Sequence, residues 1–110
     1  MDATYTRIGN TVILHLTGIC DYGDDVKLLN LTEKAAGEAH TTIAIDLTKM
    51  DYINSIGIAS LLSILKHADQ NNMDFVLYGM NQKIMLIMEK VFVNNFVPLL
   101  TEQEFRAKYL

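Results

Sequence analysis

Short runs rich in β-branched residues alternate along this chain with longer stretches in which apolar residues recur every three or four positions. The short runs are typical of strands, and the longer stretches of helices that bury one face. Strands are predicted at residues 3–8, 11–17, 42–47, 74–79 and 97–100. Helices are predicted to begin near residues 24, 56, 82 and 101. We therefore expect an α/β fold in which about four helices pack on a central mixed β-sheet of roughly four to five strands.

Several boundaries of these elements carry their own signal. Gly9-Asn10 lies between the first two strands and suits a two-residue hairpin turn. Asp24 or Asp25 is placed to cap the first helix, and Asn81 to cap the third. The chain is therefore expected to open with a β-hairpin. Near its end, Thr101 and Glu104 have the spacing of a capping box, and Pro98, which has no N–H to donate, predicts an edge strand.

The first two predicted helices each have an apolar stripe. In the first helix the stripe is Leu28, Leu31, Ala35 and Ala39. In the second, over about residues 56–69, it is Ile58, Leu61, Leu62, Leu65 and Ala68. Ser60, Ser63 and His67 are expected on the opposite, polar side of the second helix.

The length of 110 residues suits one domain, so we expect residues 1–110 to form it. Half of the residues are hydrophobic and 20% are charged, a balance that supports a buried core and argues against intrinsic disorder. No apolar run approaches the roughly 20 residues that a membrane-spanning helix needs. The first residues lack the basic and apolar segments of an export signal, so no membrane association or export is expected.

Charge and ligand chemistry exclude further classes of function. The formal net charge is −4 and no run of Lys or Arg occurs, which argues against nucleic-acid binding. Cys20 is the only cysteine, and His15, His40 and His67 stand far apart without the spacing of metal ligands. We therefore expect no metal and no cofactor, and a reduced, cytoplasmic protein.

The most informative segment is the predicted turn Asn54-Ser55-Ile56-Gly57, where a strand leads into the second helix. Backbone N–H groups at a helix N-terminus favour negative charge, so a phosphate on Ser55 would be tolerated there. The alternative is that Ser55 or Asn54 serves only as a helix cap, a role worth about 1 kcal/mol. The tetrapeptide alone favours the cap.

Three segments together resemble the STAS domain of anti-sigma factor antagonists. They are residues 16–21 (LTGICD), 45–48 (IDLT) and 52–62 (YINSIGIASLL). The resemblance runs from Gly18 to the region of Leu100 and implies an α/β domain that binds a serine-kinase anti-sigma factor. In that family the kinase phosphorylates the first hydroxyl residue of the central motif, which corresponds to Ser55 here. With this resemblance, the phosphoacceptor role becomes favoured over the cap.

The chain departs from the family's motif at two positions. Asn54 stands where the family has an aspartate, which removes a charge but keeps a side chain able to cap a helix. Ile56 stands where the family has a second hydroxyl, so Ser55 is the only acceptor in the turn. Ile56 is expected either to anchor a partner or to belong to the core.

The resemblance also implies a partner surface around Ser55. Asp21 takes the place of an acidic turn residue near the acceptor and either contacts the kinase or serves only the turn. Gly57 is expected to permit close approach of backbone or partner, and Ser60 to belong to the adjoining contact face of the helix. Phosphorylation of Ser55 is expected to break the contact, a serine phosphatase to restore it, and ATP to belong to the kinase, because this chain has no phosphate-binding glycine loop.

Two other classes of function compete with this one. Ser55 as a catalytic nucleophile needs a nearby base, and His67 lies some 18 Å further along the helix axis at about 1.5 Å per residue, so no enzyme is expected. The remaining alternative is a STAS module that acts as a scaffold, or as a nucleotide or lipid sensor, in a signalling complex without the Ser55 switch. The departures at Asn54 and Ile56 keep that alternative open.

The third predicted helix has an unusual run of apolar residues. Ile84-Met85-Leu86-Ile87-Met88 leaves no polar outer face, although a helix packed on a sheet normally keeps one. Met85 and Leu86 therefore either form a second interface, with a weak homodimer as one possibility beside the monomer, or are covered by the C-terminal segment around Phe105. The second alternative is slightly favoured.

Overall fold

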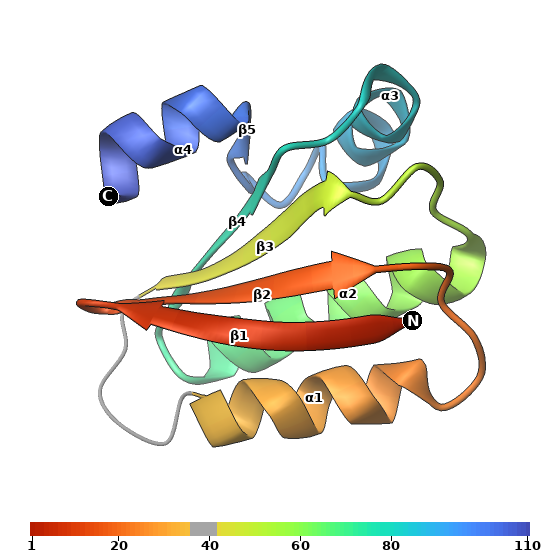
Figure 1. The fold of residues 1–110 in the computed structure, drawn as a ribbon, viewed down its shortest axis with the longest axis horizontal. Coiled ribbons are helices and arrows are strands. Elements are labelled where there is room, and N and C mark those ends of the chain that lie inside the picture. Colours follow the sequence, from red (N-terminus) through yellow and green to blue (C-terminus); the bar gives the residue numbers. More distant parts are fainter. Residues whose placement is uncertain (36–41) are drawn as a thin grey trace.

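A five-stranded sheet with the spatial order β1-β2-β3-β4-β5 forms the centre of the fold in the computed structural model, which describes residues 1–35 and 42–110 (Figure 1). The strands are β1 (Asp2–Ile8), β2 (Thr11–Thr17), β3 (Thr42–Lys49), β4 (Asp74–Tyr78) and β5 (Leu99–Leu100). The helices are α1 (Asp24–Ala35), α2 (Ser55–Gln70), α3 (Gln82–Val91) and α4 (Glu102–Tyr109). Among the strands of the described residues, β1 and β2 pair antiparallel, and the other neighbours pair parallel. The predicted mixed α/β architecture is confirmed.

Most of the predicted local signals act at the ends of these elements, but Asp24 and Asp25 lie within the first turn of α1 and do not occupy its cap position. Gly9 takes the positive φ of +58° in the hairpin turn between β1 and β2. Thr101 and Glu104 form the predicted capping box of α4, with each side chain bonded to the other residue's backbone. Predicted boundaries of the longer elements differ from those observed by at most two residues. The predicted strand at 97–100 shortens to two residues, and Ala39 lies outside the described residues.

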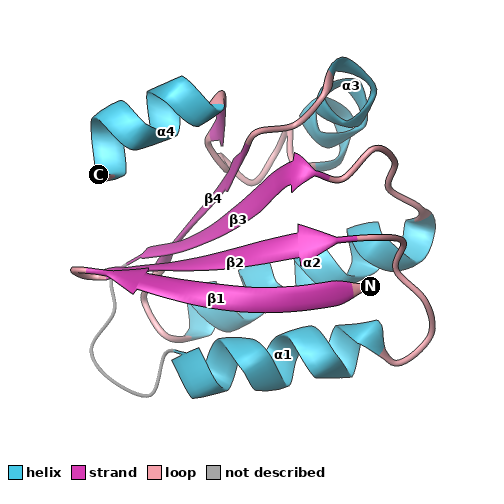
Figure 2. Cartoon of the chain, viewed as in Figure 1, coloured by secondary structure: helices cyan, strands magenta, loops and turns pink. Residues whose placement is uncertain are grey.

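The two faces of the sheet are covered differently (Figure 2). On one face α1 and α2 bury the larger core, in which Leu14, Ile45 and Leu77 are fully buried, and α3 contributes Ile84 and Met88 to the same core. On the other face α4 buries a smaller cluster around Phe105. The ring of Phe105 stacks on that of Tyr78 with a centroid distance of 4.0 Å.

The predicted polar side of α2 is wrong at Ser60. This residue is 1% exposed and its hydroxyl donates to the carbonyl oxygen of Ile56 at 2.9 Å. Ser60 lies one helical turn from Gly57 and from Ile64, which are both buried, so it shares their face. Since α2 packs against α1 as well as the sheet, it buries a wider arc than a single stripe. Conversely Leu62, predicted in the apolar stripe, is 38% exposed.

The favoured expectation for the third helix is also wrong. Phe105 belongs to the cluster on the opposite face of the sheet, so the C-terminal helix does not cover Met85 and Leu86. Leu86 is 56% exposed and Met85 is partly buried. The physical reason is that α4 begins directly after β5 and Phe105 stacks on Tyr78, which holds α4 on the face away from the larger core. Among the described residues, no helix is long and apolar enough to cross a membrane.

Candidate functional site at the N-terminus of helix α2

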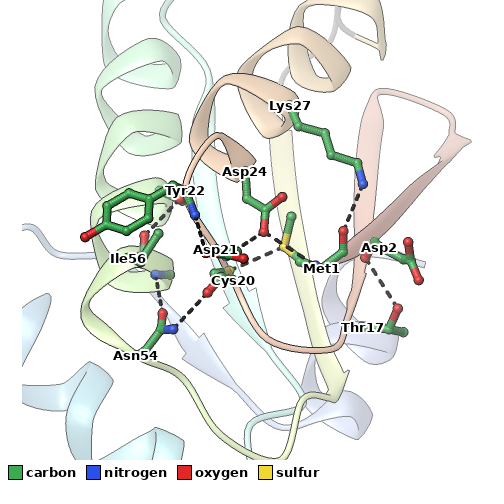
Figure 3. A network of polar contacts seen from close by, with 12 residues as sticks. Met1, Asp2, Thr17, Cys20, Asp21, Tyr22, Asp24, Lys27, Asn54 and Ile56 are labelled. Carbon is green, nitrogen blue, oxygen red and sulfur yellow. Dashed lines mark hydrogen bonds and ion pairs between the residues drawn. The ribbon is translucent and has the colours of Figure 1, made fainter.

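Asn54 is the N-cap of α2 and ties this helix to the loop after β2. Its side-chain oxygen accepts from the backbone N–H of Gly57 at 2.8 Å, and its side-chain nitrogen donates to the carbonyl oxygen of Cys20 at 2.8 Å (Figure 3). Only an amide makes both bonds, because an ionised carboxylate has no proton to donate. The departure from aspartate at this position therefore has a structural reason: the side chain joins two loops.

Ser55 is the first residue of α2 and is exposed. Since Asn54 makes the capping bond, the cap alternative fails for Ser55. Among the described residues, the Ser55 hydroxyl has no hydrogen-bond partner, and the first turn of α2 contains no acidic side chain. The hydroxyl thus lies at the positive end of a 16-residue helix, in a place where added negative charge is stabilised.

Gly57 is buried and serves the packing of its own chain. A Cβ at this position would lie 2.8 Å from Cγ1 of Ile53 and 3.2 Å from the sulfur of Cys20. Of the two readings of this glycine, the structure supports close approach within the chain, and both Gly57 and Ser60 are buried. Burial also raises the pKa of the Cys20 thiol, so the sulfur beneath the turn is a packing group.

Asp21 organises the loop before α1. Its side chain accepts from the N–H of Tyr22 at 2.8 Å, and its own N–H donates to the carboxylate of Asp24 at 2.7 Å. That backbone hydrogen bond is the main reason why the pKa of Asp24 lies below its usual value. Asp21 therefore acts as a turn residue, yet it remains exposed on the loop that Asn54 ties to α2.

Exposed apolar side chains lie in the two loops that meet at Asn54, and the sequence patterns did not predict them. Tyr22 is 90% exposed, Ile19 60% and Tyr52 56%. Ile56, which follows Ser55, is partly buried. The sequence did contain a signal for them: Tyr22 and Tyr52 lie close to Asp21 and Asn54 in predicted loops. Loops on a rigid scaffold commonly carry binding residues. We call Ile19, Tyr22, Tyr52, Ser55 and Ile56 the α2 entry surface.

A second polar cluster lies on the face of the sheet opposite α1 and α2. His15 Nδ1 and Asp46 Oδ2 are 2.6 Å apart, and the hydroxyl of Thr6 lies 2.9 Å from His15 Nε2. Burial works to raise the pKa of Asp46, but hydrogen bonds from Thr48 and His15 outweigh it and hold that pKa below its usual value. The same burial raises the pKa of Tyr78. His15 is thus engaged on the sheet, on a different element from Ser55. No group of three or more metal-ligating side chains occurs within residues 1–35 and 42–110.

The chain matches a known protein family and has the fold of several solved structures. The family model of the STAS domain matches residues 2–105. A Thermotoga maritima protein described as an anti-sigma factor antagonist has a TM-score of 0.79 at 17% identity, covering 96% of this chain and 92% of its own. No curated protein matches the sequence.

Two further structures have the same fold. The Bacillus anti-sigma factor antagonist SpoIIAA, in its unphosphorylated form, has a TM-score of 0.67 at 19% identity, covering 99% of this chain and 100% of its own. Its phosphorylated form gives 0.69 at 17% identity over the same coverage. A component of the stressosome, a signal integration and transduction hub, gives 0.71 at 13% identity, covering 96% of this chain and 94% of its own. At these identities the likeness establishes the fold.

Proposed function

This chain belongs to the STAS domain family, and we propose that it acts as an anti-sigma factor antagonist. In this proposal the α2 entry surface binds a serine-kinase anti-sigma factor, and binding releases a sigma factor for transcription. Phosphorylation of Ser55 by the kinase ends the contact, and a serine phosphatase restores it. The observation that carries the proposal is the exposed Ser55 hydroxyl, which does not cap the helix because Asn54 makes the capping bond.

The local electrostatics support a switch that acts without refolding. A phosphate adds a charge of about −1.5 to −2, and the helix N-terminus stabilises this charge within the free domain. In a complex the same charge would have to be desolvated in the midst of apolar side chains such as Tyr22 and Tyr52, which costs binding energy. The domain therefore tolerates the modification, whereas the contact does not.

Relatives of the same fold support this assignment. SpoIIAA is named as an anti-sigma factor antagonist and has been solved in both unphosphorylated and phosphorylated forms. Phosphorylation is thus compatible with this fold in a relative. Our proposal carries the modification to Ser55 because it follows the capping residue at the start of α2 in this chain.

Incubation with ATP and candidate kinase-type anti-sigma factors from the same genome tests the proposal. We expect mass spectrometry to locate a phosphate on Ser55, the Ser55→Ala variant to lack it, and Ser55→Asp to lose kinase binding. Ser63→Asp is the matched control, because Ser63 lies two turns further along α2 and bonds only the carbonyl of Ala59. Binding by Ser55→Asp as tight as that of the wild type would disprove the gating mechanism.

The similarity to a stressosome component favours a second candidate, a scaffold in a large signalling complex. A scaffold would assemble with its partners whether or not Ser55 carries a charge. Sedimentation of the chain with its genomic neighbours distinguishes the two: a small kinase complex that Ser55→Asp abolishes supports the antagonist. A large assembly that Ser55→Asp leaves intact supports the scaffold.

A further inference from the structure

Four neighbouring strands contribute a row of polar side chains on the face of the sheet that carries α4. His15 of β2 is paired with Asp46 of β3 in the sheet register, and Asp46 is paired with Tyr78 of β4. Thr6 of β1 reaches His15 from the other side. Ser55 lies at the start of α2, which packs on the opposite face. The polar row is therefore separate from the α2 entry surface.

The hydrogen bonds of His15 determine where its proton lies. Its Nδ1 is 2.6 Å from a carboxylate oxygen of Asp46, and its Nε2 is 2.9 Å from the hydroxyl oxygen of Thr6. An ionised carboxylate can only accept, so Nδ1 donates to Asp46. In the neutral ring Nε2 then accepts from the Thr6 hydroxyl. A hydroxyl bonded to an imidazole that a carboxylate orients is the arrangement of an activated nucleophile.

The carboxylate of Asp46 is held in place through its other oxygen. Oδ1 accepts from the backbone N–H of Thr48 at 2.9 Å and from the Thr48 hydroxyl at 2.7 Å. The side chain of Asp46 is only 16% exposed, and that of His15 is 34% exposed. Burial works to raise the pKa of Asp46, but the bonds from Thr48 and His15 keep that pKa below its usual value. The group that orients His15 is therefore fixed and ionised at neutral pH.

The hydroxyl, the imidazole and the carboxylate line one cavity, which has a volume of ≈ 200 Å³. Its apolar wall includes Ile13 and Phe105. The cavity is smaller than the roughly 300–1,000 Å³ of sites for drug-sized ligands, so it suits a short acyl group. Arg106 lines the same cavity with its Nε 3.6 Å from Glu102. The other N–H groups of its guanidinium can stabilise the negative oxygen that forms when a carbonyl is attacked.

From this geometry we propose that Thr6, His15 and Asp46 form a hydrolytic site for small uncharged esters with a short acyl chain. The Thr6 oxygen attacks the ester carbonyl carbon while its proton passes to His15 Nε2. The ester C–O bond then breaks, the departing alkoxide takes that proton and leaves as the alcohol, and the acyl group stays on Thr6. Water next attacks the acyl carbon and gives a proton to His15. This proton returns to the Thr6 oxygen as the carboxylic acid leaves, and Arg106 stabilises the oxyanion in both steps.

Hydrolysis of p-nitrophenyl acetate, followed by the absorbance of the released p-nitrophenol, tests the activity. We expect turnover above the buffer rate and a loss of about tenfold or more in kcat/KM for Thr6→Val, which removes the hydroxyl but keeps the β-branched shape. Thr6→Ser keeps a hydroxyl and should stay active. Thr4→Val is the matched control, because Thr4 pairs with His15 in the hairpin register and its hydroxyl has no hydrogen-bond partner among the described residues. A rate equal to that of buffer overturns the proposal, and so does a Thr6→Val variant as active as the wild type.

Labelling of the wild type identifies the nucleophile without any variant that has to fold. A fluorophosphonate bonds irreversibly to an activated hydroxyl and loses fluoride, and mass spectrometry of the digested chain locates the label. We expect the label on Thr6. No label, or a label only on other residues, overturns the assignment of Thr6.

Asp46→Asn tests the positioning role of the carboxylate. The asparagine keeps an oxygen for Thr48, while its NH₂ group donates to Nδ1 of His15. The ring proton then moves to Nε2, and Thr6 loses its base. We expect kcat to fall by about tenfold or more while KM and the circular dichroism spectrum stay unchanged. An unchanged kcat would mean that Asp46 serves only the sheet, and it would overturn the three-residue site.

Discussion

Helices α2 and α3 start in nearly the same way, yet only one of these starts has the features of a binding site. Asn54 accepts from the N–H of Gly57 and donates to Cys20, while Asn81 accepts from the N–H of Ile84 and donates to Asp51, all at 2.8–2.9 Å. Each asparagine thus caps its helix and ties it to another loop. An asparagine cap is therefore a device of the fold and does not mark function.

The difference lies in the residues that follow the caps. After Asn54 come an exposed serine, a partly buried isoleucine and a buried glycine, and the two loops that meet at Asn54 carry exposed apolar side chains. After Asn81 come two exposed polar residues and Ile84, which is fully buried in the core. In α3 the third residue, Ile84, is part of the hydrophobic core. In α2 the third residue is Gly57, and its missing side chain lets the Cys20 loop pack closely against the helix.

The largest effect is expected at the third position of α3. Ile84→Ala removes a fully buried side chain and leaves a cavity, so we expect a loss of about 2–5 kcal/mol in the free energy of unfolding. Urea denaturation measures it. Partner binding at the α2 entry surface should survive in the folded fraction. A loss below about 1 kcal/mol would show that this end of α3 is not part of the cooperative core.

A smaller effect is expected at the equivalent position of α2. Gly57→Ala brings a methyl group within 2.8 Å of Ile53 Cγ1, and such overpacking costs about 1–3 kcal/mol. The same clash pushes α2 away from the Cys20 loop, so kinase binding should weaken together with stability. Ala59→Gly is the control for backbone entropy, because Ala59 is an exposed residue two positions further along α2. Full stability of Gly57→Ala would contradict the close approach.

These two positions also show how far the sequence predicts the fold and the site. Alternating strand and helix patterns, the Gly9 turn and the capping box are local signals, and they predicted the architecture. The burial of Ser60 and the contact between Gly57 and Cys20 depend on how α1 and the loop after β2 pack on α2. Such packing joins residues more than 30 positions apart, and no local pattern encodes it. The exposure of Tyr22 and Tyr52 has the same origin.

An intermediate effect is expected when the donor of each cap is removed. Asn54→Asp keeps the acceptor but leaves the carbonyl of Cys20 without its donor in a partly buried place, which costs about 1–2 kcal/mol. Asn81→Asp should cost less than about 1 kcal/mol, because its bond to Asp51 is exposed and water replaces it, while its second, part-buried contact with the Met50 carbonyl is long at 3.5 Å. Thermal unfolding of both variants compares them. Equal losses of stability in the two variants would mean that the hydrogen bond from Asn54 to Cys20 stabilises the domain no more than the bond from Asn81 to Asp51.

The smallest effect on stability is expected at the first position of each helix. Ser55→Ala should change the free energy of unfolding by less than about 0.5 kcal/mol, because the hydroxyl has no partner among the described residues. Ser55→Asp and Gln82→Asp should each stabilise by about 0.3–1 kcal/mol, since both place a carboxylate at the positive end of a helix. Their effects on kinase binding should differ, with Ser55→Asp abolishing it and Gln82→Asp leaving it intact. If Ser55→Asp is more stable than the wild type and yet does not bind the kinase, the charge acts on the contact with the kinase and not on the folding of the domain. If Ser55→Asp instead destabilises the domain, its loss of binding follows from a damaged helix start and the local switch is wrong.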